Sequence, residues 1–494
     1  MNGWFRNTRS LLLAATGIML LAVALRWDAF SLLDTMHHDE VLQYQERAFR
    51  MVFGRGIVPW ETRYGLRNAL IPDFLAGAMQ LGRLLNHDHW TPILLARVLF
   101  AAVCLAAVPA AYALGALRSR THGLVAMFVA AVWYESVLFG VHVLSESVAA
   151  SFALSGVAAL LRAGANRRAA LLAGFLLAMT VLLRLQYGVF AAVLVPLVLR
   201  RDGSAWRHLA VGALPAVALG AVTDLAAGQL PFAWVFVNVT MNTLGGRAAF
   251  FGVENGFYYP RMILAQLDPV AIPILIGAVL SGPRYRPVLI AALATIAVHS
   301  LIGHKEYRFI WVPVFLIVIL AAIAATDGLE RITANAGPRV RVGGLAALCI
   351  GWAAVSGWSY VQGRDRLSLD GTGRDGALLA RTAIHAATLP GACGVAVAEE
   401  ERRPIAQVFM PRPVELYLFP DSMNRGEQSF APSLAAGANA LIITRGAAPP
   451  PGYRRIACEV ERERNVCLYR REGGCDARTG KPWTYQSVLL AHDL

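Results

Sequence analysis

Four ionisable residues, His37, His38, Asp39 and Glu40, follow the first apolar segment of the chain. Beyond them, apolar residues recur at positions 41, 44, 48 and 52, close to the helical repeat. This spacing predicts an amphipathic helix that lies on a membrane surface and carries the two carboxylates at its start. A carboxylate in such a place can act as a general base and take the proton of a hydroxyl group. We therefore regard Asp39 as the candidate catalytic base, with Glu40 beside it.

Asp39 could also cap the helix or bind a metal ion. Aspartate is favoured as a helix N-cap, but a capping box needs Glu or Gln three residues later, where this chain has Leu42. The two flanking histidines suggest a metal ligand set. Four consecutive residues cannot all converge on one ion without a distant partner, so we expect no metal here.

The composition indicates an integral membrane protein. Of the 494 residues, 56% are hydrophobic and 16% are charged, whereas soluble proteins average about 25% charged residues. A bilayer span needs about 20 apolar residues, and we count about eleven such segments. They centre on 10–30, 93–117, 123–142, 146–163, 169–184, 186–199, 208–227, 263–281, 287–302, 307–325 and 342–358.

Arginine clusters predict the orientation of these segments. They precede the first segment and follow the second, fourth, sixth, eighth and tenth, which is the same side in every case. The positive-inside rule makes this side cytoplasmic. The net charge of +13 then marks a membrane face and not a nucleic-acid surface. The outer side carries a first loop at 31–92, a second at 228–262, the turn at His304 and the residues after 358.

A second group of charges, from His304 to Arg308, joins two apolar segments on the outer side. Lys305 is one of two lysines in a chain that otherwise uses arginine. Lysine presents a compact charge to phosphate, and Arg308 can make bidentate contacts. The alternative is a basic turn among lipid head groups, but positive charge on the outer side runs against the positive-inside rule. An anionic lipid-phosphate ligand would explain it.

Further polar residues on or near the outer side are candidate substrate contacts, because ionisable groups at membrane depth are functional candidates by default. They are His38, Trp60, Glu61, Arg67, Glu146 and Arg184. The aromatic-rich loop at 228–262, with a turn at Gly245-Gly246, is either an interfacial aromatic belt or a loop that faces acceptor or lipid.

Residues 359–494 have the composition of a soluble domain. A helix near 376–388, strands at 394–398 and 440–444, and a hairpin between 453 and 469 predict a small α/β domain on the outer face. Its cysteines are Cys393, Cys458, Cys467 and Cys475. An even number favours one or two disulfides in an oxidising compartment, and Cys458 and Cys467 could face each other across the hairpin. Zinc is the competing interpretation, but no Cys-x-x-Cys spacing occurs.

Two segments resemble glycosyltransferase family 22, which contains the mannosyltransferases of GPI-anchor and N-glycan assembly. His38-Asp39-Glu40, the helix ending at Phe53-Gly54, Trp60-Glu61 and Arg67 are similar to the first outer loop of that family. His304-Lys305-Glu306 with Arg308-Phe309 is similar to its His-Lys-Glu-x-Arg-Phe motif. The resemblance covers residues 10–330. The chain departs from the pattern at His38, Pro59 and Asn68, which bears on the sugar and acceptor more than on the chemistry.

The resemblance implies a GT-C fold for residues 1–358. It implies inverting transfer of mannose, or a related sugar, from a polyprenyl-phosphate donor to a glycan, glycolipid or lipid-linked acceptor. Asp39 would be the base, and His304 and Lys305, with Arg308, would lie near the donor phosphate. The chain has no Asp-x-Asp motif, which agrees with a donor that lacks a diphosphate. A lipid phosphate leaves as an anion and needs cations, so no metal or cofactor is expected.

Alternatives remain at this point. A lipid-linked-sugar transporter or flippase would show inverted repeats and polar groups near the midplane, whereas the polar features here gather at one surface. A scaffold protein would leave the Asp39 and Lys305 clusters unexplained. Among transferases, a pentose donor or a protein acceptor is also open. Arginine usage and the outer cysteines fit a bacterial inner membrane, with the active site and the C-terminal domain on the periplasmic side.

Overall fold

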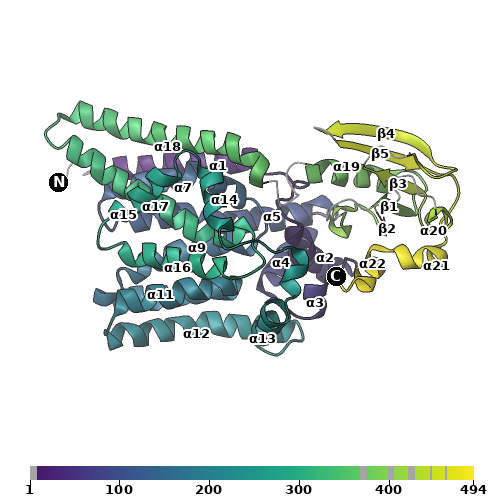
Figure 1. Cartoon of the computed structure of the whole chain (residues 1–494), viewed down its shortest axis with the longest axis horizontal. Helices are drawn as coiled ribbons and strands as arrows, with labels where there is room; N and C mark the ends of the chain where they lie inside the picture. Colours follow the sequence, from purple (N-terminus) through teal and green to yellow (C-terminus); the bar gives the residue numbers. More distant parts are fainter. Residues whose placement is uncertain (1–7, 368–374, 399–404, 421–428, 445–447, 462–463) are drawn as a thin grey trace. The chain divides into compact units, whose positions relative to one another are not determined.

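The computed structural model describes residues 8–367, 375–398, 405–420, 429–444, 448–461 and 464–494 (Figure 1). The chain divides into two compact units. Unit 1 comprises Met1–Phe30, Asn68–Leu70 and Phe100–Arg366, and unit 2 comprises Ser31–Arg67, Ile71–Leu99 and Leu367–Leu494. Most of the predicted first outer loop therefore belongs to the same unit as the C-terminal domain.

Unit 1 is helical, and every apolar segment predicted from the sequence forms helix. The longer helices are α1 (Thr8–Ala29), α6 (Ala107–Gly115), α7 (Arg120–Val132), α9 (Ser145–Leu160), α10 (Arg167–Leu183), α11 (Gly188–Leu199), α12 (Gly203–Ala226), α14 (Tyr258–Leu267), α15 (Ala271–Leu280), α16 (Arg286–Ser300), α17 (Trp311–Ile332) and α18 (Pro338–Leu367). Short helical pieces lie between them, namely α8 (Tyr134–Phe139), η2 (Ala163–Ala165), η3 (Leu185–Tyr187), α13 (Ala233–Asn238), η4 (Val239–Leu244), η5 (Arg247–Phe251) and η6 (Tyr307–Ile310).

Length separates these helices into two classes. In the described part of the chain, five are long and apolar enough to cross a bilayer: Thr8–Ala29, Trp90–Gly115, Gly203–Ala226, Tyr307–Ile332 and Pro338–Gln362. A sixth span results if α14 and α15, bent by 101° at a short break, are taken as one. The other predicted segments form shorter or interrupted apolar helices, so eleven full-length spans stay a prediction.

Helix α17 forms the core of unit 1. It contacts α7, α9, α15 and α16, and nearly all of its residues up to Ile323 are buried. Helices α10 and α12 cross closely at two glycines: a Cβ on Gly174 would lie 2.0 Å from the carbonyl oxygen of Leu209, and one on Gly212 would lie 2.0 Å from that of Leu171. Small residues at such crossings allow membrane helices to approach.

The helical part of unit 2 confirms the helix predicted after Asp39. A π-helical segment, η1 (Glu40–Gln45), continues into α2 (Glu46–Phe53), and α3 (Trp60–Arg63), α4 (Leu70–Leu85) and α5 (Trp90–Leu105) follow. Helix α2 ends where predicted, at Gly54, which adopts a left-handed conformation with φ of 71°. Single π-helical turns are rare in proteins, and those that occur often lie at functional sites.

The C-terminal part of unit 2 is a five-stranded sheet with the order β2-β1-β3-β5-β4. Its strands are β1 (Gly394–Ala398), β2 (Glu415–Phe419), β3 (Ala440–Ile443), β4 (Arg454–Glu461) and β5 (Arg464–Arg470). Strand β1 pairs in parallel with β2 and β3, and β5 pairs antiparallel with β3 and β4. Helix α19 (Asp375–Thr388) packs on this sheet (Figure 1). The predicted helix, strands and hairpin are confirmed, whereas β2 was not predicted.

Short elements complete this part of unit 2: η8 (Gln407–Phe409), α20 (Ala431–Gly437), α21 (Ala477–Gly480), η10 (Lys481–Trp483) and α22 (Tyr485–Ala491). Two disulfides cross-link the C-terminal domain. Cys458 pairs with Cys467 across the β4–β5 hairpin, as the sequence suggested, and Cys393 pairs with Cys475 across 82 residues. The preference for disulfides over zinc is thereby confirmed.

Candidate active site

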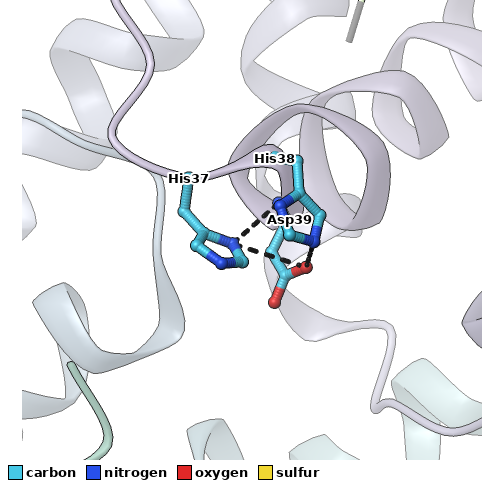
Figure 2. A group of neighbouring side chains, drawn as sticks. All are labelled: His37, His38 and Asp39. Carbon is cyan, nitrogen blue, oxygen red and sulfur yellow. Dashed lines mark hydrogen bonds and ion pairs between the residues drawn. The ribbon is translucent and has the colours of Figure 1, made fainter. Parts of the chain in front are cut away.

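Asp39 lies directly before η1, with its carboxylate against two imidazoles. Figure 2 shows the rings of His37 and His38 beside one another, with the carboxylate within reach of a nitrogen of each ring. The Oδ1 atom lies 3.5 Å from Nδ1 of His37 and 3.3 Å from Nε2 of His38. Asp39 is 6% exposed and His37 3%. Within the described helix start, the Asp39 side chain makes no capping hydrogen bond, so its contacts favour the base over the N-cap.

The two histidines approach Asp39 more closely than the sequence led us to expect. His37, His38 and Asp39 offer one ligand atom each within 4.8 Å of one another, while Glu40 does not join them. However, Nδ1 of His37 already accepts the backbone N–H of Asp39 at 3.1 Å. A ring nitrogen has one lone pair, so this atom cannot bind a cation while that bond persists. His37 could then reach a cation only through Nε2, and the absence of a metal at Asp39 stays a prediction.

Glu40 has a different environment from Asp39. It is fully buried, with Oε1 3.4 Å from Nη2 of Arg97 and Oε2 accepting the N–H of Met36 at 3.1 Å. Arg97 also donates to the carbonyl oxygen of Leu32 at 2.8 Å. These contacts tie the start of η1 to α5. Glu40 stays a proposed partner of Asp39, and its ion pair favours a role in holding the helix in place.

Glu61 is the second carboxylate of the first loop. Its Oε1 accepts the amide N–H of Gln43 at 2.8 Å. Desolvation, and then the negative charge of Asp39, raise the pKa of Glu61 to about 7, while the charge of Arg67 opposes this. Trp60 beside it is 4% exposed. Asp39, Glu61 and Arg67 thus interact electrostatically within one unit.

The site residues predicted in unit 1 form a buried network of charges. Oε1 of Glu146 lies 3.1 Å from Nη2 of Arg184 and 3.4 Å from Nη1 of Arg308. Glu306 is paired with Nε of Arg308, and its Oε1 lies 2.9 Å from Nε2 of His304. Glu146 is fully buried, and Arg184 and Arg308 are 2% and 5% exposed. The structure therefore joins both predicted arginines through a carboxylate.

Lys305 is held by backbone oxygens. Its ammonium donates to the carbonyl oxygens of Glu254 at 2.7 Å, Ile302 and Gly303. It is 6% exposed. Among the described residues, the partners of the ammonium are backbone carbonyls. No carboxylate there compensates the positive charge of Lys305.

The ring of Phe309 and the carboxylate of Glu135 hold the segment from His304 to Phe309 in place. The guanidinium carbons of Arg184 and Arg308 lie 4.8 Å and 5.1 Å from the ring centre of Phe309. The hydroxyl of Tyr307 donates to Oε1 of Glu135 at 2.5 Å. Glu135 is fully buried and also accepts the indole N–H of Trp133 at 3.0 Å. These interactions hold the segment from His304 to Phe309 against α8 and α10.

The predicted site residues fall into two groups, one in each unit. Unit 2 contains His38, Asp39, Glu40, Trp60, Glu61 and Arg67, and unit 1 contains Glu146, Arg184, His304, Lys305 and Arg308. Sequence reasoning missed Arg97 and Gln43 as partners of these groups. Arg97 had a signal, because a lone arginine inside an apolar segment needs a partner. Gln43 had none, because an amide on a helix does not reveal what it faces.

Comparisons with known proteins show the fold and the family. The chain is 14% identical to ArnT from Cupriavidus metallidurans, whose crystal structure is bound to undecaprenyl phosphate, with a TM-score of 0.52 over 92% of this chain and 98% of that one. It is 12% identical to the Archaeoglobus fulgidus oligosaccharyltransferase, with a TM-score of 0.53 over 90% of this chain and 70% of that one. At these identities the likeness shows the fold alone, which is the GT-C glycosyltransferase fold.

A sequence relative and a family model identify the family as well as the fold. The chain is 29% identical over 408 residues to GPI mannosyltransferase 3 of Trypanosoma brucei brucei, across 72% of each chain. The model of the Alg9-like mannosyltransferase family matches residues 17–355, more than half of the chain. The resemblance noted in the sequence is thereby confirmed. The chain belongs to the Alg9-like mannosyltransferase family and is a multi-pass membrane glycosyltransferase with the GT-C fold.

Proposed function

We propose that the chain transfers mannose, or a related sugar, from a polyprenyl-phosphate donor to a glycan, glycolipid or lipid-linked acceptor, with inversion of the anomeric centre. The family membership and the trypanosomal relative support mannose as the transferred sugar. The undecaprenyl phosphate bound to the structural neighbour supports a polyprenyl-phosphate donor. We place the reaction on the outer, periplasmic face of a bacterial inner membrane because the arginine clusters mark the other face.

The observation that carries the proposal is the buried carboxylate of Asp39, which lies against two imidazoles. As the acceptor oxygen attacks C1 of the donor sugar, its proton passes to the Asp39 carboxylate. The bond between C1 and the phosphate oxygen breaks, and its electron pair leaves with the lipid phosphate. Nδ1 of His37 accepts the backbone N–H of Asp39, so this hydrogen bond holds the backbone from which the carboxylate projects.

The charge network of unit 1 suits a leaving phosphate. Arg184 and Arg308 balance the two carboxylates of Glu146 and Glu306. The ring nitrogens of His304 lie within hydrogen-bond distance of the carbonyl oxygen of Gly252 and of a carboxylate oxygen of Glu306. With Lys305 the network then has an excess of positive charge. Oriented cations of this kind stabilise charge that develops on a leaving group.

The proposal is tested by sugar transfer from a synthetic polyprenyl-phosphate mannose in purified protein. Asp39→Asn should lower kcat by about 10²–10⁴-fold, the usual contribution of a general base. Asp88→Asn is the matched control, because Asp88 is an exposed aspartate of the same unit. Transfer that survives EDTA in the wild type would support the metal-free scheme. Equal transfer by wild type and Asp39→Asn would refute the role of Asp39.

Lys305→Met tests the second half of the site. It removes the uncompensated charge, so the KM for the donor should rise at least tenfold while the protein still folds. The expected ratio corresponds to about 1.4 kcal/mol or more of lost binding. An unchanged donor KM would show that Lys305 only holds the loop at residues 302–305.

A further inference from the structure

Glu46 is a fully buried carboxylate on α2, about two turns after Asp39 along the same continuous helical segment. Its Oε2 accepts the backbone N–H of Ile57 at 2.5 Å, and its Oε1 accepts that of Val408 at 2.6 Å. The two donors lie 11 and 362 residues away in the chain. Both oxygens of one side chain therefore join the loop after α2 to the C-terminal domain inside unit 2.

His89 holds the same residue of the C-terminal domain from its other side. Its Nε2 lies 2.9 Å from the carbonyl oxygen of Val408. A carbonyl only accepts, so the ring carries its proton on Nε2. Burial lowers the pKa of His89 to about 4, and the ring is neutral near pH 7. The backbone of Val408 is thus bound at its N–H by Glu46 and at its carbonyl by His89.

Arg55 extends this contact along residues 407–412. Its guanidinium donates to the side-chain oxygen of Gln407 at 3.0 Å and to the carbonyl oxygens of Met410 and Arg412 at 3.0 and 3.4 Å. It also lies 5.1 Å from the ring centre of Phe49 on α2. Charged hydrogen bonds of this kind contribute more than neutral ones.

The loop after α2 is shaped for this contact. A Cβ on Gly56 would lie 2.9 Å from the carbonyl oxygen of Glu46 and 3.0 Å from Cβ of Arg50. Glycine therefore lets the loop pass close enough for Ile57 to reach the Glu46 carboxylate. A separate contact lies further along, where the side-chain amide of Gln486 exchanges two hydrogen bonds, at 2.8 and 3.0 Å, with the backbone of Val58.

We propose that Glu46, Arg55 and His89 clamp residues 407–412, and that the C-terminal domain thereby fixes the helix that carries Asp39. These three are positioning residues for the transfer, a statement that rests on the proposed function of Asp39. The clamp gives the C-terminal domain a role: it is a rigid support for the catalytic helix. Because a misplacement of about 1 Å can cost about 100-fold in rate, loosening the clamp should be visible in turnover.

The experiment combines amide hydrogen exchange with steady-state kinetics on the purified full chain. It compares wild type, Glu46→Gln, Glu46→Ala and His89→Ala at pH 8, where Glu46 is ionised, since burial raises its pKa to about 7. Glu459→Gln is the matched control, because its carboxylate is 59% exposed on β4 of the same domain. The Val58–Gln486 contact does not involve Glu46, so it should keep the variants assembled.

In Glu46→Ala we expect faster exchange in the peptides that contain Ile57 and Val408. The kcat should fall by about 10–100-fold, with the donor KM within about threefold of wild type. Glu46→Gln keeps one acceptor oxygen and should lie between wild type and Glu46→Ala in both readouts. His89→Ala leaves the bond to Ile57 intact, so it should raise exchange in the 407–412 peptide only and lower kcat less. Glu459→Gln should change neither.

Two results would overturn the inference: faster exchange at both peptides with unchanged kcat, or a lower kcat without faster exchange. A parallel rise in donor KM and fall in kcat would also contradict it, because that pattern indicates general unfolding of the site. The proposed function fails separately, if Asp39→Asn transfers as fast as wild type. The exchange measurements need no substrate, so they judge the clamp in either case.

Discussion

The ion pair between Glu40 and Arg97 allows a quantitative test of what holds the catalytic helix. Both side chains are almost fully buried, at 0% and 1% exposure. Arg97→Met removes the cation and leaves Glu40 buried without it, which costs about 3–5 kcal/mol. Adding Glu40→Gln removes the uncompensated charge, so the double variant should recover about 1–3 kcal/mol of that loss. Glu40→Gln by itself should cost less than Arg97→Met, because its amide can still accept from Met36.

The assay is reversible unfolding in mixed detergent micelles, for the wild type, both single variants and the double variant. A coupling energy near zero in this cycle would refute the view that the pair supports the helix start. A second readout separates support from catalysis. If Glu40→Gln abolishes transfer while its free energy of unfolding equals that of wild type, Glu40 acts chemically beside Asp39 and our structural interpretation of the ion pair is wrong.

Two other predictions concern unit 2. The pKa of Glu61 is raised from 4.5 to about 7, so the folded chain binds this proton more tightly than the unfolded chain does; the associated stability is fully present below 4.5 and is lost as the pH rises to about 7. Glu61→Gln should therefore lose less stability than wild type between about pH 5 and 8, and an identical pH profile would contradict the assignment. The disulfides should differ in effect: in the chain-entropy model, loss of Cys393–Cys475, across 82 residues, costs about 4–5 kcal/mol, and loss of Cys458–Cys467, across 9, about 2–3 kcal/mol. Denaturant unfolding of the two paired Cys→Ser variants measures this, and equal losses would count against the model.

Local patterns were enough to predict most elements of the fold. Apolar length identified the helical segments of unit 1, five or six of which are long enough in the described residues to cross a bilayer. Helical spacing predicted the helix from 41 to 53, which ends at Gly54 as expected. Alternation and turn residues predicted β1, β3 and the β4–β5 hairpin. These features are readable because each depends on neighbours a few residues away. Strand β2 was missed because its apolar run, from Leu416 to Phe419, is short and follows a proline-rich stretch.

The candidate site was predictable only in part. The types and spacing of His38-Asp39-Glu40 and of His304 to Arg308 pointed to a base and to cations, and the family match confirms the resemblance that they carried. Their partners were not readable. Asp39 and Glu40 are adjacent in sequence, yet one faces two imidazoles and the other pairs with Arg97. Successive residues of a helix point in different directions, so only the packed structure decides what each meets.

By itself, the sequence determined that this is a membrane protein, where its apolar helices lie, and which motifs place it among the glycosyltransferases. The tertiary structure decided which carboxylates support the fold and which remain candidates for chemistry. It brought Glu46 to Val408 across 362 residues and joined Arg184 to Arg308 through Glu146. The physical reason is that a buried charge must find a partner, and nothing in the spacing of residues says which distant segment supplies it.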